Sequence, residues 1–193
     1  MKIMVTGGAG FIGSHLVDAL VTAGHAVVVV DNLRRGKREQ VNPAAVFENV
    51  DIVMPALVDV VRQHSPQVIF HLAAQGDLRY SVAEPLADAE INILGSVNVI
   101  VAARRTGVER IIFSSSGGAI YGDTAVRPTP EDHPAAPASP YGVGKLTVEH
   151  YLRLYRPLGL RSISLRYANV YGPRQRADGE AGVVAIFTDR FLR

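Results

Sequence analysis

Cysteine and tryptophan are both absent from this chain of 193 residues. Without cysteine there can be no disulfide and no thiol nucleophile, and the commonest zinc ligand is missing. The six histidines are scattered along the sequence, and none is paired with another at the spacing typical of metal ligands. The sequence therefore predicts no metal site.

An excess of charge of one sign and long apolar runs are also missing. The net charge is only +2, and the pI near 9.0 reflects a small surplus of lysine and arginine rather than a basic stripe, so no nucleic-acid partner is expected. No apolar run approaches the roughly 20 residues that cross a bilayer. No apolar leader precedes the glycine-rich turn near residue 7. We expect a cytoplasmic, globular protein without a membrane partner.

Strand-like and helix-like segments alternate along the chain, which predicts an α/β fold: a doubly wound parallel sheet with helices on both faces. A loop with four prolines is expected at 117–138. The expected strands are 2–5, 26–30, 45–50, 68–72, 110–115 and 161–167, and the expected helices are 11–23, 55–64, 85–105, 140 to about 157, and 183–193.

Three glycines, Gly7, Gly10 and Gly13, lie between the first expected strand and the first expected helix. Such glycines allow a tight turn, a close approach of the backbone to a pyrophosphate, and close packing of helix on strand. The helix N-terminus offers free N–H groups and a positive dipole end to phosphates. Strand, glycine turn and helix in this order predict a dinucleotide site.

Asp31, at the end of the second expected strand, favours NAD over NADP as the cofactor. It follows Gly13 by 18 residues, close to the spacing of a carboxylate that binds the adenosine ribose. A carboxylate about 4 Å from a phosphate charge costs about 4 kcal/mol at an effective dielectric near 20. Four cations after Asp31 either offset that repulsion or form a solvated loop: Arg34, Arg35, Lys37 and Arg38.

Tyr141 and Lys145 are four residues apart in an expected helix that Ser139 caps and Pro140 begins. Side chains at this spacing share one helix face. An ammonium beside a phenol favours phenolate and lowers its pKa from about 10, so Tyr141 is expected to transfer protons near neutral pH. A serine cluster at 114–116 precedes the pair.

Several motifs occur in an order that resembles the extended short-chain dehydrogenases/reductases, and within them the UDP-glucose 4-epimerases and related nucleotide-sugar epimerases. They are T-G-G-A-G-F-I-G, D-N-L, H-L-A-A-Q, S-S-S-G-G-A-I-Y-G, S-P-Y-G-V-G-K and L-R-Y-A-N-V-Y-G-P-R-Q. The resemblance implies an NAD-binding Rossmann domain at 1–168 and the start of a truncated substrate-binding region at 169–193, with the C-terminal substrate domain largely missing.

The resemblance also implies a role for each matching residue. Ser116, Tyr141 and Lys145 would be catalytic. Ser116, Tyr141 and Asn169 would contact a nucleotide sugar such as a UDP-hexose. NAD would be held by Tyr141, Lys145 and fourteen further residues: Gly7, Gly10, Phe11, Ile12, Gly13, Asp31, Asn32, Asp51, Ile52, Leu72, Ala73, Ala74, Gln75 and Asn92.

The implied reaction is a 4-epimerisation by transient oxidation. Tyr141 takes the proton of the sugar 4-hydroxyl, hydride passes to NAD, and hydride returns to the opposite face of the 4-keto sugar. A homodimer is also implied, through the 85–105 helix and the helix of Tyr141.

Two alternatives remain open. One is a 4,6-dehydratase or another NAD-dependent sugar-nucleotide oxidoreductase. In dehydratases of this family an acidic residue follows the Ser/Thr, whereas Gly117 and Gly118 follow Ser116 here. The other alternative is an inactive NAD-binding fragment.

Some of these residues also have structural interpretations. Asn92 is interpreted from sequence alone as a buried amide, and His71 as a buried, hydrogen-bonded histidine. Ser114 and Ser115 are expected to bond the backbone at the end of their strand. The tyrosines other than Tyr141 are expected to pack.

Overall fold

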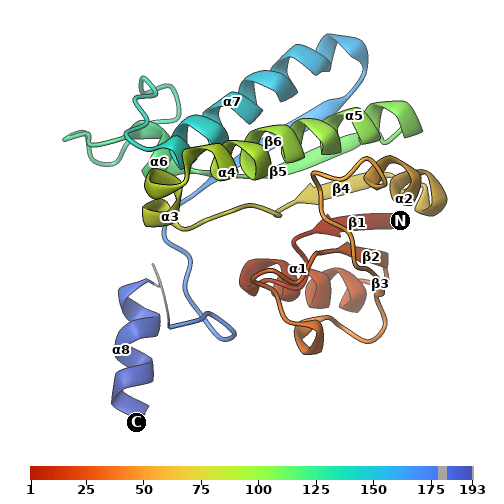
Figure 1. The fold of residues 1–193 in the computed structure, drawn as a ribbon, viewed down its shortest axis with the longest axis horizontal. Helices are drawn as coiled ribbons and strands as arrows, with labels where there is room; N and C mark the ends of the chain where they lie inside the picture. Colours follow the sequence, from red (N-terminus) through yellow and green to blue (C-terminus); the bar gives the residue numbers. More distant parts are fainter. Residues whose placement is uncertain (178–181, 193) are drawn as a thin grey trace.

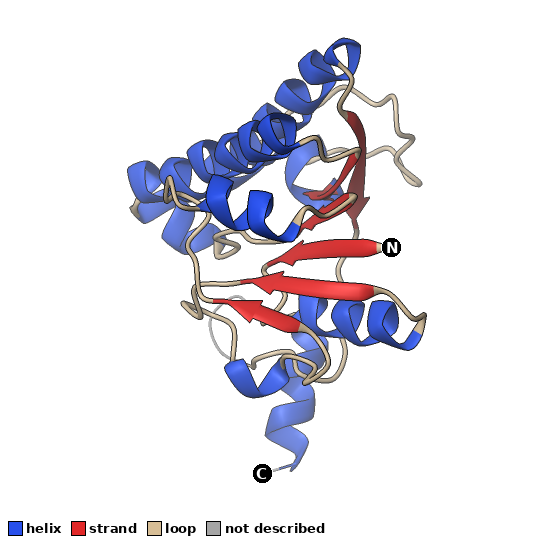
Figure 2. Cartoon of the chain, turned by 90° about the vertical axis from the view of Figure 1, so that its right-hand side faces the viewer, coloured by secondary structure: helices blue, strands red, loops and turns tan. Residues whose placement is uncertain are grey.

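The computed structural model describes residues 1–177 and 182–192. A parallel sheet of six strands lies at its centre, in the order β3-β2-β1-β4-β5-β6 (Figures 1 and 2). The order reverses between β1 and β4, which is the switch point where doubly wound sheets bind ligands. The strands are β1 (Lys2–Thr6), β2 (Ala26–Val30), β3 (Val46–Glu48), β4 (Val68–His71), β5 (Arg110–Ser116) and β6 (Arg161–Tyr167). The doubly wound α/β prediction is confirmed.

Most helices connect consecutive strands. The longer ones are α1 (Phe11–Thr22), α2 (Leu57–His64), α5 (Ser96–Thr106), α7 (Pro140–Tyr155) and α8 (Val183–Leu192). The shorter ones are η1 (Arg38–Gln40), α3 (Leu78–Ala83), α4 (Pro85–Ala89), the π-helical turn η2 (Glu90–Gly95), α6 (Gly117–Tyr121) and η3 (Arg156–Leu158).

The two faces of the sheet bury separate apolar clusters. On one face, Met4 and Ile69 pack with α2, α5 and α7 through Leu57, Ile100 and Leu152. The other face packs on α1, which buries Val17 against alternate valines of β2. Alternation along each strand sends successive side chains to opposite faces, so both faces of the central strands are apolar.

The face of the sheet that α1 covers over β1–β3 is less covered over β6. Ile163 and Leu165 of this edge strand are 48% and 37% exposed. Helix α8 stands away from the sheet in Figure 1, and Phe187 and Phe191 on it are exposed. Apolar surface on β6 and α8 is therefore left open by the residues that the structure describes.

Helices α4, η2 and α5 form one stretch of 22 residues, Pro85–Thr106, that is long and apolar enough to span a membrane by length and composition alone. The expectation that no such run exists is therefore wrong. The stretch packs against α2 and α7, and four residues of α5 are fully buried in the core: Val99, Ile100, Ala102 and Ala103. This burial is typical of a core helix.

Two short α-helices, and the 3-10 turn η1, lie where the sequence predicts no helix. Helix α6 begins the segment 117–138 that was expected to be a loop throughout, and Ser116 caps it through a hydrogen bond from the Ala119 N–H. Helix α3 begins after Asp77, whose side chain accepts a hydrogen bond from the Tyr80 N–H. The expected helix at 183–193 is present to Leu192, and residue 193 lies outside the described residues.

Candidate active site

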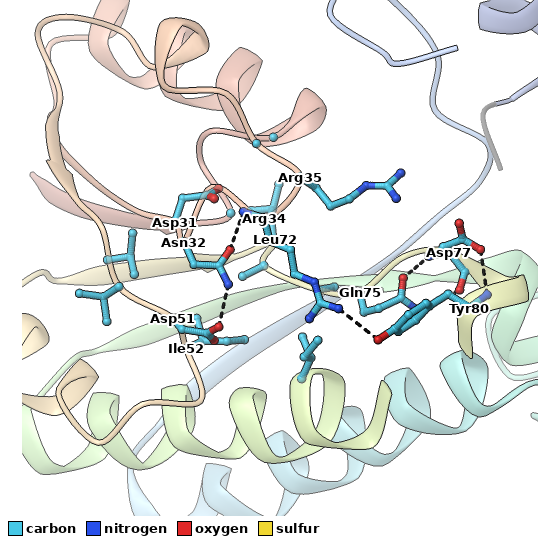
Figure 3. Close-up of a pocket in the computed structure, with 18 residues that line it drawn as sticks. Asp31, Asn32, Arg34, Arg35, Asp51, Ile52, Leu72, Gln75, Asp77 and Tyr80 are labelled. Atoms are coloured by element: carbon cyan, nitrogen blue, oxygen red, sulfur yellow. Dashed lines mark hydrogen bonds between the residues drawn. The ribbon is translucent and has the colours of Figure 1, made fainter. Parts of the chain in front are cut away.

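A cavity of about 320 Å³ opens beside the carboxyl ends of β1, β2 and β4, at the switch point of the sheet (Figure 3). Ten of the residues predicted to bind NAD line it: Gly7, Gly10, Asp31, Asn32, Asp51, Ile52, Leu72, Ala73, Ala74 and Gln75. The structure thus brings together residues from three separate motifs of the sequence and from the segment that follows β3.

The glycine turn is shaped as its predicted roles require. Gly7 has a φ of +73°, and its N–H donates to the Val30 carbonyl at 2.8 Å. A Cβ on Gly7 would lie 2.6 Å from the Ala73 nitrogen, and one on Gly13 would lie 2.1 Å from the Gly7 carbonyl oxygen. Neither position can carry a larger side chain without moving the backbone. The turn therefore presents bare backbone to the cavity.

Asp31 lies at the cavity wall with both carboxylate oxygens hydrogen-bonded. The N–H groups of Ala9 and Leu33 donate to them at 3.0 and 2.8 Å. Burial raises the pKa of Asp31, and the two backbone hydrogen bonds oppose that effect. Each oxygen keeps a second lone pair, so the carboxylate can still accept from ligand hydroxyls.

Asn32 and Asp51 form the adjoining part of the wall. The Asn32 side-chain amide donates to an Asp51 carboxylate oxygen at 2.7 Å. The other Asp51 oxygen accepts from the Val53 N–H at 3.1 Å. These bonds hold the ends of β2 and β3 together beside the cavity.

Arg34 and Tyr80 line the cavity as well. The sequence named Arg34 only as one of four cations that either offset phosphate repulsion or form a solvated loop, and it gave Tyr80 no role here. An Arg34 guanidinium nitrogen donates to the Tyr80 hydroxyl at 3.1 Å, and the Arg34 side chain reaches from the loop after β2 to α3 (Figure 3). The guanidinium also lies 5.6 Å from the centre of the Tyr80 ring. The position of Arg34 shortly after Asp31 is the only feature of the sequence that points to a place in the cavity. No such feature marks Tyr80, because helix α3, which carries it, was not predicted.

Some predicted cofactor or substrate residues lie outside this cavity. Phe11 lines a neighbouring cavity of about 210 Å³ that shares Gly10 with the first. Asn169 is exposed on the segment after β6 and lines neither cavity. The rest are Ile12 and Gly13 on α1, Asn92 on η2, and Ser116, Tyr141 and Lys145 farther along the sheet.

Asn92 is buried and acts on the cavity through Gln75. Its side-chain oxygen accepts from the Gln75 N–H, and its amide nitrogen donates to the Gln75 carbonyl, both at 2.9 Å. The interpretation of Asn92 as a satisfied buried amide is confirmed. The pair of bonds fixes the backbone of the β4–α3 loop where it lines the cavity.

Tyr141 and Lys145 share one face of α7, as predicted. Ser139 caps this helix by accepting from the Gly142 N–H at 3.1 Å, and the Tyr141 N–H donates to the buried Ser81 hydroxyl at 2.7 Å. Lys145 is 4% exposed, and its Nζ donates to the Ser114 carbonyl at 2.8 Å. The same nitrogen lies 5.6 Å from the centre of the Tyr141 ring.

The pKa of Tyr141 is raised, so the expectation of a lowered value is wrong for this structure. Burial is the largest cause and disfavours phenolate. A hydrogen bond with Ser116 lowers the pKa, and the negative charge of Asp88 raises it. Burial also lowers the pKa of Lys145 to about 8, while Asp88 acts in the opposite direction.

Ser116 and Ser115 point to different partners at the end of β5. Ser116 bonds Tyr141, which places the predicted Ser–Tyr–Lys set together. Ser115 donates to a Glu149 carboxylate oxygen at 2.6 Å, so its expected backbone bond is wrong. Glu149 also holds Arg166 of β6 through two hydrogen bonds of 3.0 and 2.7 Å.

His71 is buried and hydrogen-bonded, as interpreted from the sequence. Its two ring nitrogens contact the hydroxyls of Thr6 and Ser96 at 2.7 and 2.9 Å. Burial lowers its pKa to about 3, and the positive charge of Lys145 adds to that shift. Within residues 1–177 and 182–192, no three or more His, Asp and Glu side chains group in a way that could hold a metal ion.

The fold and the site define a class: a doubly wound α/β protein with a cavity at the switch point of its sheet and a tyrosine and a buried lysine on one face of α7. A family model for the NAD dependent epimerase/dehydratase family matches residues 3–193. The chain belongs to this family.

Named relatives are similar over the whole chain. The UDP-glucose 4-epimerase of Mycolicibacterium smegmatis is 47% identical over 198 residues, covering 100% of this chain and 63% of that protein. The putative UDP-glucose 4-epimerase of Methanocaldococcus jannaschii is 45% identical over 192 residues, covering 99% of this chain and 63% of that protein.

Two solved structures are similar in fold. The UDP-glucose 4-epimerase of Thermotoga maritima with UDP-glucose has a TM-score of 0.97 at 52% identity. The UDP-glucose 4-epimerase of Thermus thermophilus in complex with NAD has a TM-score of 0.96 at 47% identity. Each comparison covers 100% of this chain and 63% of the other, so the chain spans about two-thirds of the length of these relatives.

Proposed function

We propose that this chain is the cofactor-binding part of an NAD-dependent nucleotide-sugar 4-epimerase that resembles UDP-glucose 4-epimerases. One observation carries the proposal: the Ser116–Tyr141–Lys145 set lies at the carboxyl edge of the same sheet as a dinucleotide-type cavity. The relatives crystallised with NAD and with UDP-glucose support the cofactor and the substrate class.

The residues present fit NAD. The bare backbone at Gly7 and Gly13 is a cradle that a Cβ would fill, and the N-terminus of α1 follows it. Asp31 lies beside that turn with free lone pairs for ribose hydroxyls. When bound, NAD supplies the acceptor and the donor of the hydride.

The chain's own residues supply proton transfer. Tyr141 takes the proton of the sugar 4-hydroxyl and later gives it back, and the Ser116 hydrogen bond favours its phenolate. Lys145 is anchored on the Ser114 carbonyl, so its position relative to the phenol is fixed. Because burial raises the pKa of Tyr141, a positively charged ligand beside the phenol would assist its ionisation.

The dehydratase alternative is less well supported by the residues near Tyr141. Elimination of water needs a further acid and base, and Gly117 and Gly118 follow Ser116 on α6. Neither glycine can transfer a proton. Epimerisation needs only the proton transfer that Tyr141 can provide.

Whole-enzyme activity is proposed for a longer form of the chain. The chain spans 63% of the length of its relatives, and Asn169 is exposed rather than directed to a cavity. The division into a cofactor domain at 1–168 and a substrate region from 169 stays a prediction, as does a cytoplasmic location. A UDP-hexose is the proposed substrate, and this chain alone is proposed to bind NAD.

A homodimer is proposed through the outer faces of α4–η2 and α7. These neighbouring helices expose Leu86, Leu94 and Leu154 by 87%, 63% and 68%. Val143 and Tyr151 lie on the same face of α7 as Leu154 by their spacing. Leu152, in contrast, is buried against the sheet.

The first test is mass spectrometry of the dinucleotide that co-purifies with the chain. NAD at near one equivalent is the expected result, whereas NADP or no dinucleotide would contradict the cofactor proposal.

The second test compares UDP-glucose epimerisation by this chain and by a form extended to the length of its relatives. In the extended form, Tyr141→Phe should lower kcat about 100-fold or more while NAD stays bound. Near-normal turnover in that variant would contradict the role of Tyr141.

A further inference from the structure

Asp88 is a buried carboxylate for which the proposed proton transfer has no use. It lies on α4, is 1% exposed, and points toward the interface with α7. One of its oxygens accepts from the Gln75 and Asn92 side-chain amides, at 3.1 and 2.9 Å. Both donors are neutral. A buried carboxylate without a cationic partner is costly, so a nearby positive charge is expected.

Lys145 is the cation that the fold places near Asp88. Gly144, the residue before Lys145, lets α4 and η2 approach α7 closely, because a Cβ there would lie 3.3 Å from the Asn92 Cβ. The second Asp88 oxygen lies 3.9 Å from the same point. Lys145 is itself buried and donates to an uncharged partner, the Ser114 carbonyl. Two opposite charges are thus buried on either side of one helix contact.

We propose that Asp88 is a positioning residue that supplies the buried negative charge which keeps Lys145 an ammonium beside Tyr141. This proposal rests on the proposed function only in assigning Lys145 to the site, since both side chains are buried whatever reaction the site performs. Asp88 also bonds Gln75, which lines the dinucleotide cavity. One carboxylate thereby joins the cofactor loop to the proton-transfer pair.

The other groups around Lys145 do not supply this charge. Glu149, one turn further along α7, is bonded to Ser115 and to the Arg166 guanidinium. Phe113 and Tyr141 present rings, with the Phe113 centre 4.8 Å from Nζ. His71 is neutral, because burial and Lys145 hold its pKa at about 3. Burial lowers the pKa of Lys145 to about 8, and Asp88 is the group that raises it. Without Asp88 the pKa of Lys145 would be lower still.

The sequence makes the test direct, because Lys2, Lys37 and Lys145 are the only lysines of the chain. Lysine Cε and Nζ resonances are followed by NMR from pH 6 to 11, with Lys145→Arg to assign the buried one. In Asp88→Asn the Lys145 midpoint should fall by about one pH unit or more, because the substitution removes the negative charge that favours the ammonium. Lys2 and Lys37 should not move.

A purely structural Asp88 gives a different result. Asn keeps a side-chain oxygen that accepts from Gln75 and Asn92, so an unchanged Lys145 midpoint in a folded Asp88→Asn chain would overturn the proposal. Asp59→Asn is the matched control, since that carboxylate is exposed on α2.

If Asp88→Asn does not fold, the unmodified chain still tests the proposal. The chemical shift of the Asp88 Cγ should then change together with the Lys145 titration near pH 8. The absence of that step would also overturn the proposal. Loss of epimerase activity plays no part in either outcome.

Discussion

At the scale of single residues, Gly13 shows how tightly the cofactor turn is built. Gly13→Ala places a methyl group 2.1 Å from the Gly7 carbonyl oxygen, so the turn or α1 must move. We expect a loss of about 1 to 3 kcal/mol in the free energy of unfolding and NAD binding weakened by roughly tenfold or more. Chemical denaturation and calorimetric titration measure the two effects.

Gly118→Ala is the control for this substitution. Gly118 lies on α6, and a Cβ there would meet no atom within 4 Å. Alanine in a helix is more stable than glycine by about 0.5 to 1 kcal/mol, so this variant should unfold no more easily than the parent. If Gly13→Ala behaved like Gly118→Ala, the turn would not be the rigid cradle described above.

His71 predicts a pH dependence of stability. Its folded pKa is about 3, whereas an unfolded histidine has a pKa of about 6.5. Between these values the unfolded chain binds more protons, so the free energy of unfolding falls as the pH falls from 6.5 toward 3. Within this range, each fall of one pH unit lowers the contribution of His71 to the free energy of unfolding by up to about 1.4 kcal/mol. His71→Gln should remove it, and denaturation at pH 4, 5, 6 and 7 measures the difference in slope.

His150→Gln provides the comparison, since it removes an exposed histidine and leaves His71 in place. An identical slope for His71→Gln and the parent chain would mean that His71 is protonated in the folded state. The burial behind this prediction depends on Thr6 and Ser96, which come from β1 and α5. No sequence pattern brings those hydroxyls to His71.

The charged side chains show where sequence reasoning stops at this scale. The spacing of Tyr141 and Lys145 predicted their shared face, because helix geometry is local. The direction of the Tyr141 pKa shift could not be predicted, because burial by neighbouring elements decides it. Arg34 likewise follows Asp31 in sequence, but its partner Tyr80 lies on a helix 46 positions away.

At the scale of elements, Glu149 joins α7 to β5 and β6. It accepts one hydrogen bond from Ser115 and two from Arg166. The Glu149 side chain is 13% exposed and the Arg166 side chain is 25% exposed. Burial works to raise the pKa of Glu149, but hydrogen bonds from Arg166 and Ser115 outweigh it and lower the pKa. This contact fixes α7 against the end of β5, where Ser116 lies.

Glu149→Gln should lower the free energy of unfolding by about 2 to 3 kcal/mol, because it leaves the Arg166 charge without its partner. Equilibrium denaturation at pH 7 measures this loss. The difference between parent and variant should shrink as the pH falls below about 4. Glu149 is then protonated first in the unfolded chain and, at lower pH, in the folded chain as well, so the ion pair no longer stabilises the fold. Glu109→Gln breaks an exposed pair with Arg161 and should cost less than about 0.5 kcal/mol. Equal losses for the two variants would contradict the stabilising role of the Glu149–Arg166 contact.

The sequence predicted long, regular elements better than short ones. β2 and β6 match their predicted ranges, because a run of valines marks β2 and alternating apolar and polar residues mark β6. Helices α3 and α6 were missed, because each has about one turn and depends on a single cap, Asp77 or Ser116. Such short helices depend on tertiary contacts rather than on a repeating apolar pattern.

At the scale of the whole molecule, two regions of the described residues group exposed apolar side chains. One is the outer face of α4–η2 and α7, and the other is the open side of β6 together with α8. The sequence could suggest the first by resemblance, but it could not show that Leu152 faces the sheet while Leu154 faces out. That distinction requires the packed position of α7.

The first region predicts that the chain dimerises through α7 and its neighbour. Leu94 is 63% exposed on η2, so Leu94→Lys should leave the folded monomer intact while placing a charge in the dimer contact. We expect sedimentation equilibrium to give a dimer for the parent chain and a dissociation constant raised by roughly tenfold or more for the variant. Met54→Lys is the matched control, because Met54 is 54% exposed on a loop outside this face. Equal weakening by both substitutions, or a parent chain that is monomeric at every concentration, would exclude this face as the contact. A shift confined to Leu94→Lys would place the two copies with their α7 helices together, so that each Tyr141 helix is held from outside as well as by its own sheet.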